Sequence, residues 1–334
     1  MRSVRIAGPG RIEIEDGPDL EPGPGEVIVD VAFAGICGSD LELYAGTRPR
    51  GLFRYPIVPG HEWSGTVRSV GANVDGQLVG RKVVGQGFTS CEECPACLDG
   101  MPMFCERGYD EIGFTRDGAW AERLKIAADR LHLLDDTADL RGAAGIEPSS
   151  CAADAIAIGG TIAERRVAVI GAGTIGLLCV QLLTALAPAE LVVVEPSAFR
   201  AERAMQLGAT KALVPAEASG LKDRFDAVIE AAGTGAAVHM AIELARPAGR
   251  VVLTGITGEE DTVALGPLVT KRLEIRTVFG GTTAGWDSAV AAFSRGQLNP
   301  ALLVSHELPL GDALEAIEIL KGRESGSLKI LLRP

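Results

Sequence analysis

The stretch that most constrains the fold is Arg166–Gly176, which reads Arg-Val-Ala-Val-Ile-Gly-Ala-Gly-Thr-Ile-Gly. Its apolar run, Val167–Ile170, is bounded by charge on one side and glycine on the other, which is typical of a short buried strand. From Thr174 onward the apolar residues recur with helical spacing. The sequence therefore predicts a buried strand, a glycine turn and a helix in succession.

The turn between these two elements has the pattern Gly-x-Gly-x-x-Gly. Gly171 would permit the tight turn, Gly173 the approach of a pyrophosphate to the backbone, and Gly176 the contact between helix and sheet. The free N–H groups at the helix start, around Thr174 and Ile175, would then face the phosphates. Because glycine is abundant, with 42 of 334 residues, the pattern alone does not distinguish a dinucleotide site from a structural turn.

The residues that follow favour the dinucleotide site. A second apolar run, Leu191–Val194, ends in Glu195, about twenty residues beyond the last glycine, where a carboxylate would accept hydrogen bonds from the adenosine ribose. Further strand-like runs at Ala227–Ile229 and Arg250–Leu253 alternate with helical segments, and Thr254 stands at the strand edge where open sheets bind ligands. This alternation predicts an α/β fold with a doubly wound parallel sheet.

The same segment bears on the choice of cofactor. We predict NAD rather than NADP because the carboxylate of Glu195 would repel a 2′-phosphate and bind the ribose hydroxyls instead. Arg200, five residues further on, leaves an alternative open, since it could stack on adenine or accommodate a phosphate. NADP therefore stays a possible cofactor.

The composition argues against several other functions. The 44 acidic and 32 basic residues give a net charge of −12 without a Lys/Arg cluster, so nucleic acid is not an expected partner. No apolar run is long enough for a membrane span, and the N-terminus lacks the order of a signal peptide, so we expect a cytoplasmic protein. The length of 334 residues allows two domains.

Cysteine, histidine and glutamate stand at metal-like spacing in the N-terminal third of the chain. Cys37, His61 and Glu62 supply a thiol, an imidazole and a carboxylate within 26 residues. Three protein ligands and one open position are what a catalytic zinc requires. A lone cysteine or histidine is more often a core residue, but the three together favour a zinc site.

Four further cysteines, Cys91, Cys94, Cys97 and Cys105, follow the spacing C-x-x-C-x-x-C with seven residues before the last. Four thiolates complete a tetrahedron around zinc and leave no position for a substrate. We therefore predict a structural zinc lobe over about residues 88–108. The alternative is four reduced cysteines in a loop, but a segment so rich in Gly, Pro and Asp has little core of its own.

Over essentially its whole length the chain resembles the zinc-dependent medium-chain alcohol dehydrogenases, in particular the polyol (sorbitol) and threonine dehydrogenase branch. Within that branch, Ser39–Tyr44 and Tyr55–Gly65 are similar to cyclitol and aminocyclitol dehydrogenases of the 2-deoxy-scyllo-inosamine type. The motifs that carry the wider resemblance are Gly35–Asp40, Pro59–Glu62, the four-cysteine segment, Glu147-Pro148 and Gly171–Gly176.

The resemblance implies the domain organisation. A mainly β GroES-like catalytic domain would occupy residues 1–154, a Rossmann domain residues 155–277, and a return to the catalytic domain residues 278–334. The active site would lie between the domains, where closure can exclude water. The resemblance also implies a homodimer or homotetramer, with one catalytic and one structural zinc per chain.

The resemblance further implies individual roles at the zinc site. Cys37 and His61 would ligate the catalytic zinc with Glu62 as a ligand or near-ligand, and Glu147 would be the conditional carboxylate that binds the metal or its water. Asp40 would accept the other N–H of His61 and fix its tautomer. Ser39 would relay the substrate proton. For Ser39 and Asp40 an alternative is helix N-capping, because Ser and Asp are favoured caps.

The chain departs from the family pattern at two places. Glu42 stands five residues after Cys37, where relatives often have a histidine that completes a proton relay to solvent. Ser149–Asp154 follow Glu147-Pro148, where many relatives have a histidine. These two departures leave the route by which the proton would reach solvent undetermined. They do not affect the predicted zinc chemistry.

Together these features predict an NAD(P)-dependent zinc dehydrogenase that interconverts a secondary alcohol and a ketone. The expected small-molecule substrate is a polyol, a cyclitol or aminocyclitol, or a sugar derivative. The alternatives are a threonine-type 3-hydroxy amino acid dehydrogenase and a relative that has kept the fold without the chemistry. A zinc-free reductase is disfavoured because Cys37, His61 and Glu62 occur together.

Overall fold

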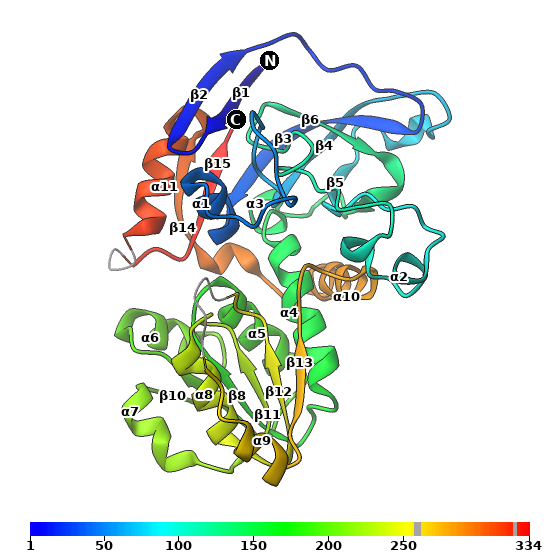
Figure 1. Cartoon of the computed structure of the whole chain (residues 1–334). Helices are drawn as coiled ribbons and strands as arrows, with labels where there is room; N and C mark the ends of the chain where they lie inside the picture. Colours follow the sequence, from blue (N-terminus) through cyan, green and yellow to red (C-terminus); the bar gives the residue numbers. More distant parts are fainter. Residues whose placement is uncertain (257–261, 323–325) are drawn as a thin grey trace. The chain divides into compact units, whose positions relative to one another are not determined.

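The computed structural model describes residues 1–256, 262–322 and 326–334 and divides into two compact units (Figure 1). Unit 1 comprises Met1–Glu147 and Asn299–Pro334, and unit 2 comprises Pro148–Leu298. The predicted divisions, after residues 154 and 277, differ from these limits. Within unit 2, Asp154 accepts hydrogen bonds from the backbone N (2.6 Å) and the Oγ1 (2.7 Å) of Thr282. These bonds connect the first helix of unit 2 to the segment that follows its last strand.

Unit 2 is built on a six-stranded sheet in the order β10-β9-β8-β11-β12-β13, with every neighbouring pair parallel. This is the doubly wound order, which reverses next to the first strand and leaves a ligand-binding crevice there. The four strands predicted from apolar runs are confirmed. The strands are β8 (Arg166–Ile170), β9 (Glu190–Val194), β10 (Lys211–Leu213), β11 (Phe225–Glu230), β12 (Ala245–Leu253) and β13 (Glu274–Thr277).

Helices accompany the strands of this sheet (Figure 1). Helix α5 (Thr174–Ala185) is apolar nearly all round, which is typical of a buried helix, and buries eight consecutive residues from Gly176 to Leu183. Cys179 on this helix is a core residue. Further α-helices among the described residues of unit 2 are α6 (Ala198–Gln206), α7 (Pro215–Ala218), α8 (Gly235–Leu244), α9 (Leu265–Thr270) and α10 (Thr283–Ser294). Helix α4 (Ile146–Gly159) begins two residues before the unit.

Unit 1 is mainly β, as the resemblance implied. A hairpin of β1 and β2 accompanies a seven-stranded sheet in the order β14-β15-β3-β4-β5-β7, with β6 also paired to β3. The strands are β1 (Arg2–Gly8), β2 (Arg11–Asp16), β3 (Glu26–Ile36), β4 (Trp63–Val70), β5 (Lys82–Gly85), β6 (Arg123–Ala127), β7 (Leu131–Leu133), β14 (Val304–Pro309) and β15 (Lys329–Arg333). The helices are α1 (Gly38–Ala45), α2 (Pro95–Leu98), α3 (Leu140–Ala143) and α11 (Ala313–Lys321).

Strand β3 organises unit 1 because three strands pair with it. β4 is antiparallel to it over most of its length, β6 pairs with its first half, and β15 pairs with its last residues. The register places Ile36 opposite Ile330 and Ala34 opposite Trp63. The residues next to these positions, Cys37, Glu62 and Lys329, are therefore brought to one end of β3.

Among residues 1–256, 262–322 and 326–334, no helix is both long and apolar enough to cross a membrane.

Candidate functional site

The candidate metal site lies at the C-terminal end of β3. Cys37 follows this strand and is the N-cap of α1, while His61 and Glu62 immediately precede β4. One ligand atom from each of the three residues lies within 4.8 Å of the others. His61 and Glu62 are buried and Cys37 is half-buried. A thiol, an imidazole and a carboxylate this close together form a donor set that suits zinc.

The imidazole of His61 has a different neighbour at each ring nitrogen. Its Nδ1 lies 3.6 Å from Asp40 Oδ1, and its Nε2 lies 3.5 Å from Ser39 Oγ. Burial disfavours a charged ring, but the charges of Asp40 and Cys37 and their hydrogen bonds outweigh it and raise the pKa of His61 well above its usual range. A field that holds a proton on this ring favours any cation at the site, so the surroundings fit a metal.

The structure shows which of the two residues, Ser39 or Asp40, caps the start of α1. Asp40 does cap the helix, since its Oδ2 accepts a hydrogen bond of 2.8 Å from Cys37 N, while its Oδ1 faces His61. Ser39 is not the N-cap residue, and its described hydroxyl contact is with His61. Asp40 therefore caps the helix with one oxygen and faces His61 with the other, without a hydrogen bond at 3.6 Å, and the Ser39 hydroxyl lies beside His61.

The carboxylate of Glu62 is paired with a residue that the sequence analysis missed. Lys329 Nζ, on β15, lies 2.6 Å and 2.8 Å from the two oxygens of Glu62 and donates to the carbonyl of Ile36 at 3.1 Å. Burial lowers the pKa of Lys329, but Glu62, Cys37 and Glu147 raise it to a net value above the usual one. The ammonium stays charged and forms a buried ion pair with the carboxylate of Glu62. One signal was present: a lysine within an apolar strand needs a buried partner.

Glu147, in the first turn of α4, stands apart from the three close ligand residues. It is half-buried, and it is not in the group whose ligand atoms lie within 4.8 Å of one another. Burial, together with the charges of Glu62 and Asp40 and against those of His61 and Lys329, raises its pKa to about 7. The carboxyl group therefore lies within the electrostatic field of the site.

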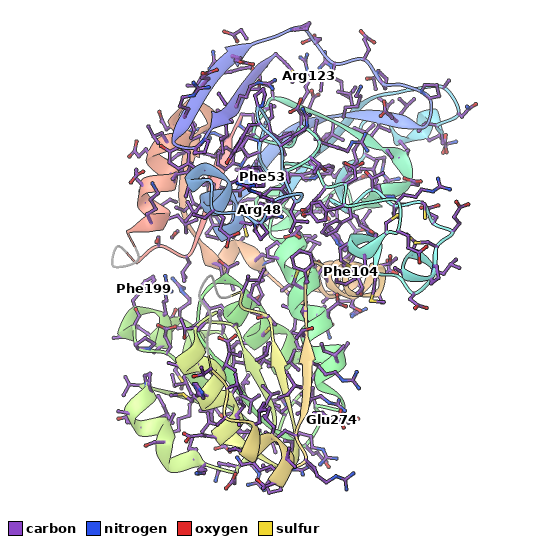
Figure 2. All side chains as sticks on the ribbon, in the orientation of Figure 1. Arg48, Phe53, Phe104, Arg123, Phe199 and Glu274 are labelled. Atoms are coloured by element: carbon purple, nitrogen blue, oxygen red, sulfur yellow. The ribbon has the colours of Figure 1, made fainter. Side chains whose placement is uncertain are left out.

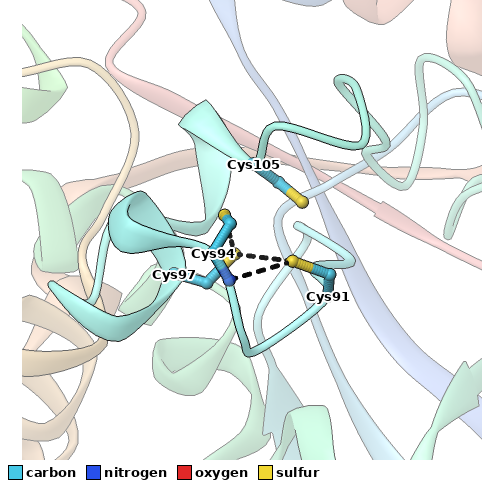
Figure 3. Close-up of side chains that lie close together, drawn as sticks. All are labelled: Cys91, Cys94, Cys97 and Cys105. Atoms are coloured by element: carbon cyan, nitrogen blue, oxygen red, sulfur yellow. Dashed lines mark hydrogen bonds between the residues drawn. The ribbon is translucent and has the colours of Figure 1, made fainter.

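The four cysteines of the predicted zinc lobe converge (Figure 3). Their four sulfur atoms lie within 4.8 Å of one another, with Cys91 to Cys97 at 3.8 Å and Cys94 to Cys97 at 3.4 Å. Zinc–sulfur bonds of about 2.3 Å in a tetrahedron give sulfur–sulfur separations of about 3.8 Å. The backbone N–H of Cys94 donates to the sulfur of Cys91 and lowers the pKa of that thiol to about 7. Burial and the neighbouring thiols raise the pKa of Cys97 to about 12, so the fit to zinc rests on the geometry of the four sulfur atoms.

The predicted glycine turn lies at the carboxyl edge of the unit 2 sheet, after β8. Gly171 has φ +91°, a conformation that side chains disfavour. A Cβ on Gly176 would lie 1.9 Å from the carbonyl oxygen of Gly171, so the helix start requires glycine there. A Cβ on Gly173 would meet nothing within 4 Å, which leaves open space beside the backbone where the pyrophosphate is expected. Thr174 and Ile175 begin α5.

Other predicted cofactor residues follow neighbouring strands of the same edge. Glu195 follows β9, and its two carboxylate oxygens accept hydrogen bonds from Ala172 N (2.7 Å) and Ser197 N (2.9 Å). Glu195 thus also holds the glycine turn, a role that spacing did not indicate. Thr254 follows β12 and donates its hydroxyl to Glu230 O at 2.9 Å, and Arg200 lies on α6.

Models of two known protein families match segments in the two units of the chain. The model of the alcohol dehydrogenase GroES-like domain matches residues 23–136, and that of zinc-binding dehydrogenases matches residues 174–295. A 2-dehydro-3-deoxy-L-galactonate 5-dehydrogenase of Pseudoalteromonas atlantica is 30% identical over 98% of this chain and 97% of its own. A sorbitol dehydrogenase of Macaca fascicularis is 32% identical over 99% and 95%.

A solved structure is equally similar. The alcohol dehydrogenase RspB of Escherichia coli CFT073, complexed with NADH, matches with a TM-score of 0.92 and 30% identity, over 100% of this chain and 99% of that one. These matches extend over both units, so they cover the candidate metal site and the glycine turn together.

Proposed function

Because the chain belongs to the zinc-dependent medium-chain alcohol dehydrogenase family, we propose that it oxidises a secondary alcohol of a polyol, a cyclitol or aminocyclitol, or a sugar derivative to the ketone with NAD. It is a dehydrogenase of the sorbitol dehydrogenase branch. The observation that carries the proposal is the convergence of Cys37, His61 and Glu62 beside Ser39. The two named relatives support a polyhydroxylated substrate.

In this proposal Cys37 and His61 hold the catalytic zinc, and Glu147 completes the ligand set when substrate or water does not. When bound, zinc polarises the alcohol oxygen and NAD accepts the carbinol hydride. Ser39 Oγ accepts the proton of the substrate hydroxyl and passes its own hydroxyl proton outward toward solvent, and Asp40 orients the imidazole of His61. The charge of Lys329 neutralises Glu62, which makes Glu62 a near-ligand.

Two measurements on the purified protein test this proposal. Elemental analysis should find two zinc ions per chain, one for each cysteine-containing site. A screen for NADH formation should find turnover with polyols, cyclitols or aminocyclitols and little with 3-hydroxy amino acids. Turnover confined to 3-hydroxy amino acids would favour the threonine-type alternative, and zinc binding without any turnover would favour a non-catalytic relative.

The cofactor preference follows from Glu195. Its carboxylate lies at the turn where the ribose is expected, and it would repel a 2′-phosphate. We therefore expect kcat/KM to be higher with NAD than with NADP, and Glu195→Gln to narrow the difference. An enzyme that prefers NADP would show that Arg200 accommodates the phosphate.

We also propose a homodimer or homotetramer. β13 is an end strand of the unit 2 sheet and all four of its residues are exposed, including Glu274 (Figure 2). An exposed edge strand offers unpaired backbone groups to a second chain. Light scattering of the full-length protein tests this assembly, and a monomer at micromolar concentration would contradict it.

A further inference from the structure

A buried carboxylate, that of Glu230, lies at the carboxyl edge of the unit 2 sheet, and the proposed reaction does not use it. Glu230 is the last residue of β11 and is 0% exposed. The parallel register places it opposite Ile170, the residue before the glycine turn. The strand order reverses between β8 and β11, which are neighbours in the sheet (Figure 1). Glu230 therefore stands at the point where open sheets of this kind bind their ligands.

The carboxylate of Glu230 holds the turn that follows it. Its Oε1 accepts hydrogen bonds from the backbone N–H groups of Ala232 and Gly233, each at 2.7 Å. The main-chain carbonyl of Glu230 accepts hydrogen bonds from the backbone N and the Oγ1 of Thr254, both at 2.9 Å. Glu230 thus connects the turn after β11 to the loop after β12.

The turn held by Glu230 lies directly against the glycine turn. A Cβ on Gly171 would lie 2.9 Å from the backbone N of Ala232 and 3.0 Å from its Cα. Whereas Glu230 is fully buried, Ala232 and Thr234 are exposed. The turn is therefore an exposed neighbour of the expected pyrophosphate site, and the group that anchors it lies underneath.

Stability alone does not account for a glutamate at this position. Its Oε2 has no hydrogen-bond partner in the part of the chain that the structure describes, and it lies 3.0 Å from where a Cβ on Gly255 would be. Burial raises the pKa of Glu230, although the N–H groups of Gly233 and Ala232 oppose the shift. Burying a carboxylate with one oxygen unsatisfied costs free energy. Costs of this kind are typical of functional sites.

Glu195 has a comparable arrangement in the other half of the sheet. It is 5% exposed, and its two oxygens accept hydrogen bonds from the backbone N–H groups of Ala172 and Ser197. A doubly wound sheet consists of two mononucleotide-binding halves, here β8 to β10 and β11 to β13. Because Glu195 belongs to the half in which the adenosine ribose is expected, the nicotinamide mononucleotide falls to the half that contains Glu230.

We propose that Glu230 is a positioning residue, which holds residues 231–234 as the wall of the cofactor site that contacts the nicotinamide mononucleotide half of NAD. This inference rests on the proposed function. It assigns the two buried carboxylates to different halves of one cofactor. Glu230 acts through the turn and not by touching the cofactor, since a turn that is already fixed loses less conformational entropy when the cofactor binds.

The test compares the dissociation constants of NADH and AMP, because AMP contains only the adenosine half. Calorimetry on the zinc-loaded full-length protein measures both. Glu230→Ala removes the acceptor of two N–H groups, so we expect Kd for NADH to rise about tenfold and Kd for AMP to change less than about twofold. Glu230→Gln is the matched control. Its amide oxygen can accept from both N–H groups, and we expect Kd for NADH to stay within about threefold of the wild-type value.

Glu195→Ala is the comparison variant in the other half. It removes a carboxylate from the adenosine side, which AMP and NADH share. We therefore expect both dissociation constants to rise by a similar factor of about tenfold. A Glu195→Ala protein with wild-type affinity for AMP would overturn the assignment of the two halves.

The outcomes separate this inference from the proposed function. A wild-type protein that binds neither NADH nor NADPH overturns the proposed function and the inference with it. A folded Glu230→Ala protein that binds NADH with wild-type affinity overturns the inference alone. So does an equal loss of affinity for NADH and AMP, because a general structural defect of the sheet would affect both ligands.

A second variant covers the case in which Glu230→Ala does not fold. Gly233 has φ +67°, and a Cβ there would lie 3.1 Å from the carbonyl oxygen of Ile256. Gly233→Ala therefore displaces the turn while the carboxylate of Glu230 stays in place. We expect Kd for NADH to rise about threefold or more, with Kd for AMP unchanged. A folded Gly233→Ala protein with wild-type affinity for NADH would overturn the inference.

Discussion

The two cysteine-containing sites of unit 1 differ in how the chain assembles them. The four-cysteine lobe takes all its donors from Cys91–Cys105, a single loop segment with α2 inside it. The site at Cys37 takes its groups from the ends of β3 and β15, the start of β4 and the start of α4. The first needs only local chain geometry, whereas the second exists only when the sheet has formed in the correct register.

The same two sites differ in the chemistry around the sulfur atoms. The lobe offers four like donors in a closed arrangement, which suits a structural ion. The site at Cys37 has mixed donors, a buried ammonium from Lys329 and a hydroxyl from Ser39 within 3.5 Å of His61. The closed set of four sulfur donors suits an ion that stabilises the fold. The mixed set at Cys37 includes groups that can bind or transfer a proton.

The largest expected effect concerns the lobe. Cys94→Ser removes one thiolate from the tetrahedron, so zinc content should fall from two ions to one per chain. Loss of a ligand that binds the folded state costs about 4 kcal/mol when free zinc is a thousandfold above Kd. Elemental analysis and denaturant unfolding measure both effects, and the unit 2 fold should persist. Unchanged zinc content would contradict the four-thiolate assignment.

The next effect concerns the buried ion pair at the other site. Lys329→Met leaves the carboxylate of Glu62 buried without its cation, and breaking such a pair costs about 3–5 kcal/mol. Lys329→Met combined with Glu62→Gln should recover much of this loss, because no buried charge is then left unpaired. Denaturant unfolding of the zinc-loaded proteins provides the measurement. A loss below about 1 kcal/mol with zinc retained would indicate that the metal neutralises Glu62, which would make it a ligand.

The comparison also explains what the sequence could predict. The four-cysteine spacing, the glycine turn and the strands after it are local patterns, and the structure contains each of them. The pairing of Lys329 with Glu62 depends on the register of β15 against β3, which links residues far apart in the chain.

A smaller effect, on rate and not on folding, concerns the proton relay. Ser39→Ala should keep both zinc ions and the melting temperature, and should lower kcat by about 10²-fold, as expected for a lost proton-transfer group. Ser39→Thr retains a hydroxyl and should recover part of the rate. Glu147→Gln is the comparison variant, and we expect it to reduce turnover while zinc stays bound. Single-turnover hydride transfer separates the cases, and a Ser39→Ala enzyme that melts lower but reacts normally would exclude the relay.

The smallest effect concerns Cys179, which belongs to neither site. Its pKa provides a comparison with the thiols of the four-cysteine lobe. Cys179 is fully buried on α5, and burial raises its pKa to about 12, in contrast to the lowered pKa of Cys91. The folded chain therefore keeps this proton at a pH where the unfolded chain, with a thiol pKa of about 8.5, loses it.

The sign of the effect follows from proton binding. Below pH of about 8.5 the contribution of Cys179 to stability is present in full, and it decreases by up to about 1.4 kcal/mol per pH unit as the pH rises toward 12. Cys179→Ala removes the titrating group, so the difference in unfolding free energy between wild type and variant should shrink between pH 8 and pH 10.5. Guanidinium unfolding at these two pH values measures it. The same difference in unfolding free energy at both pH values would show that the thiol ionises as readily in the folded core as in the unfolded chain.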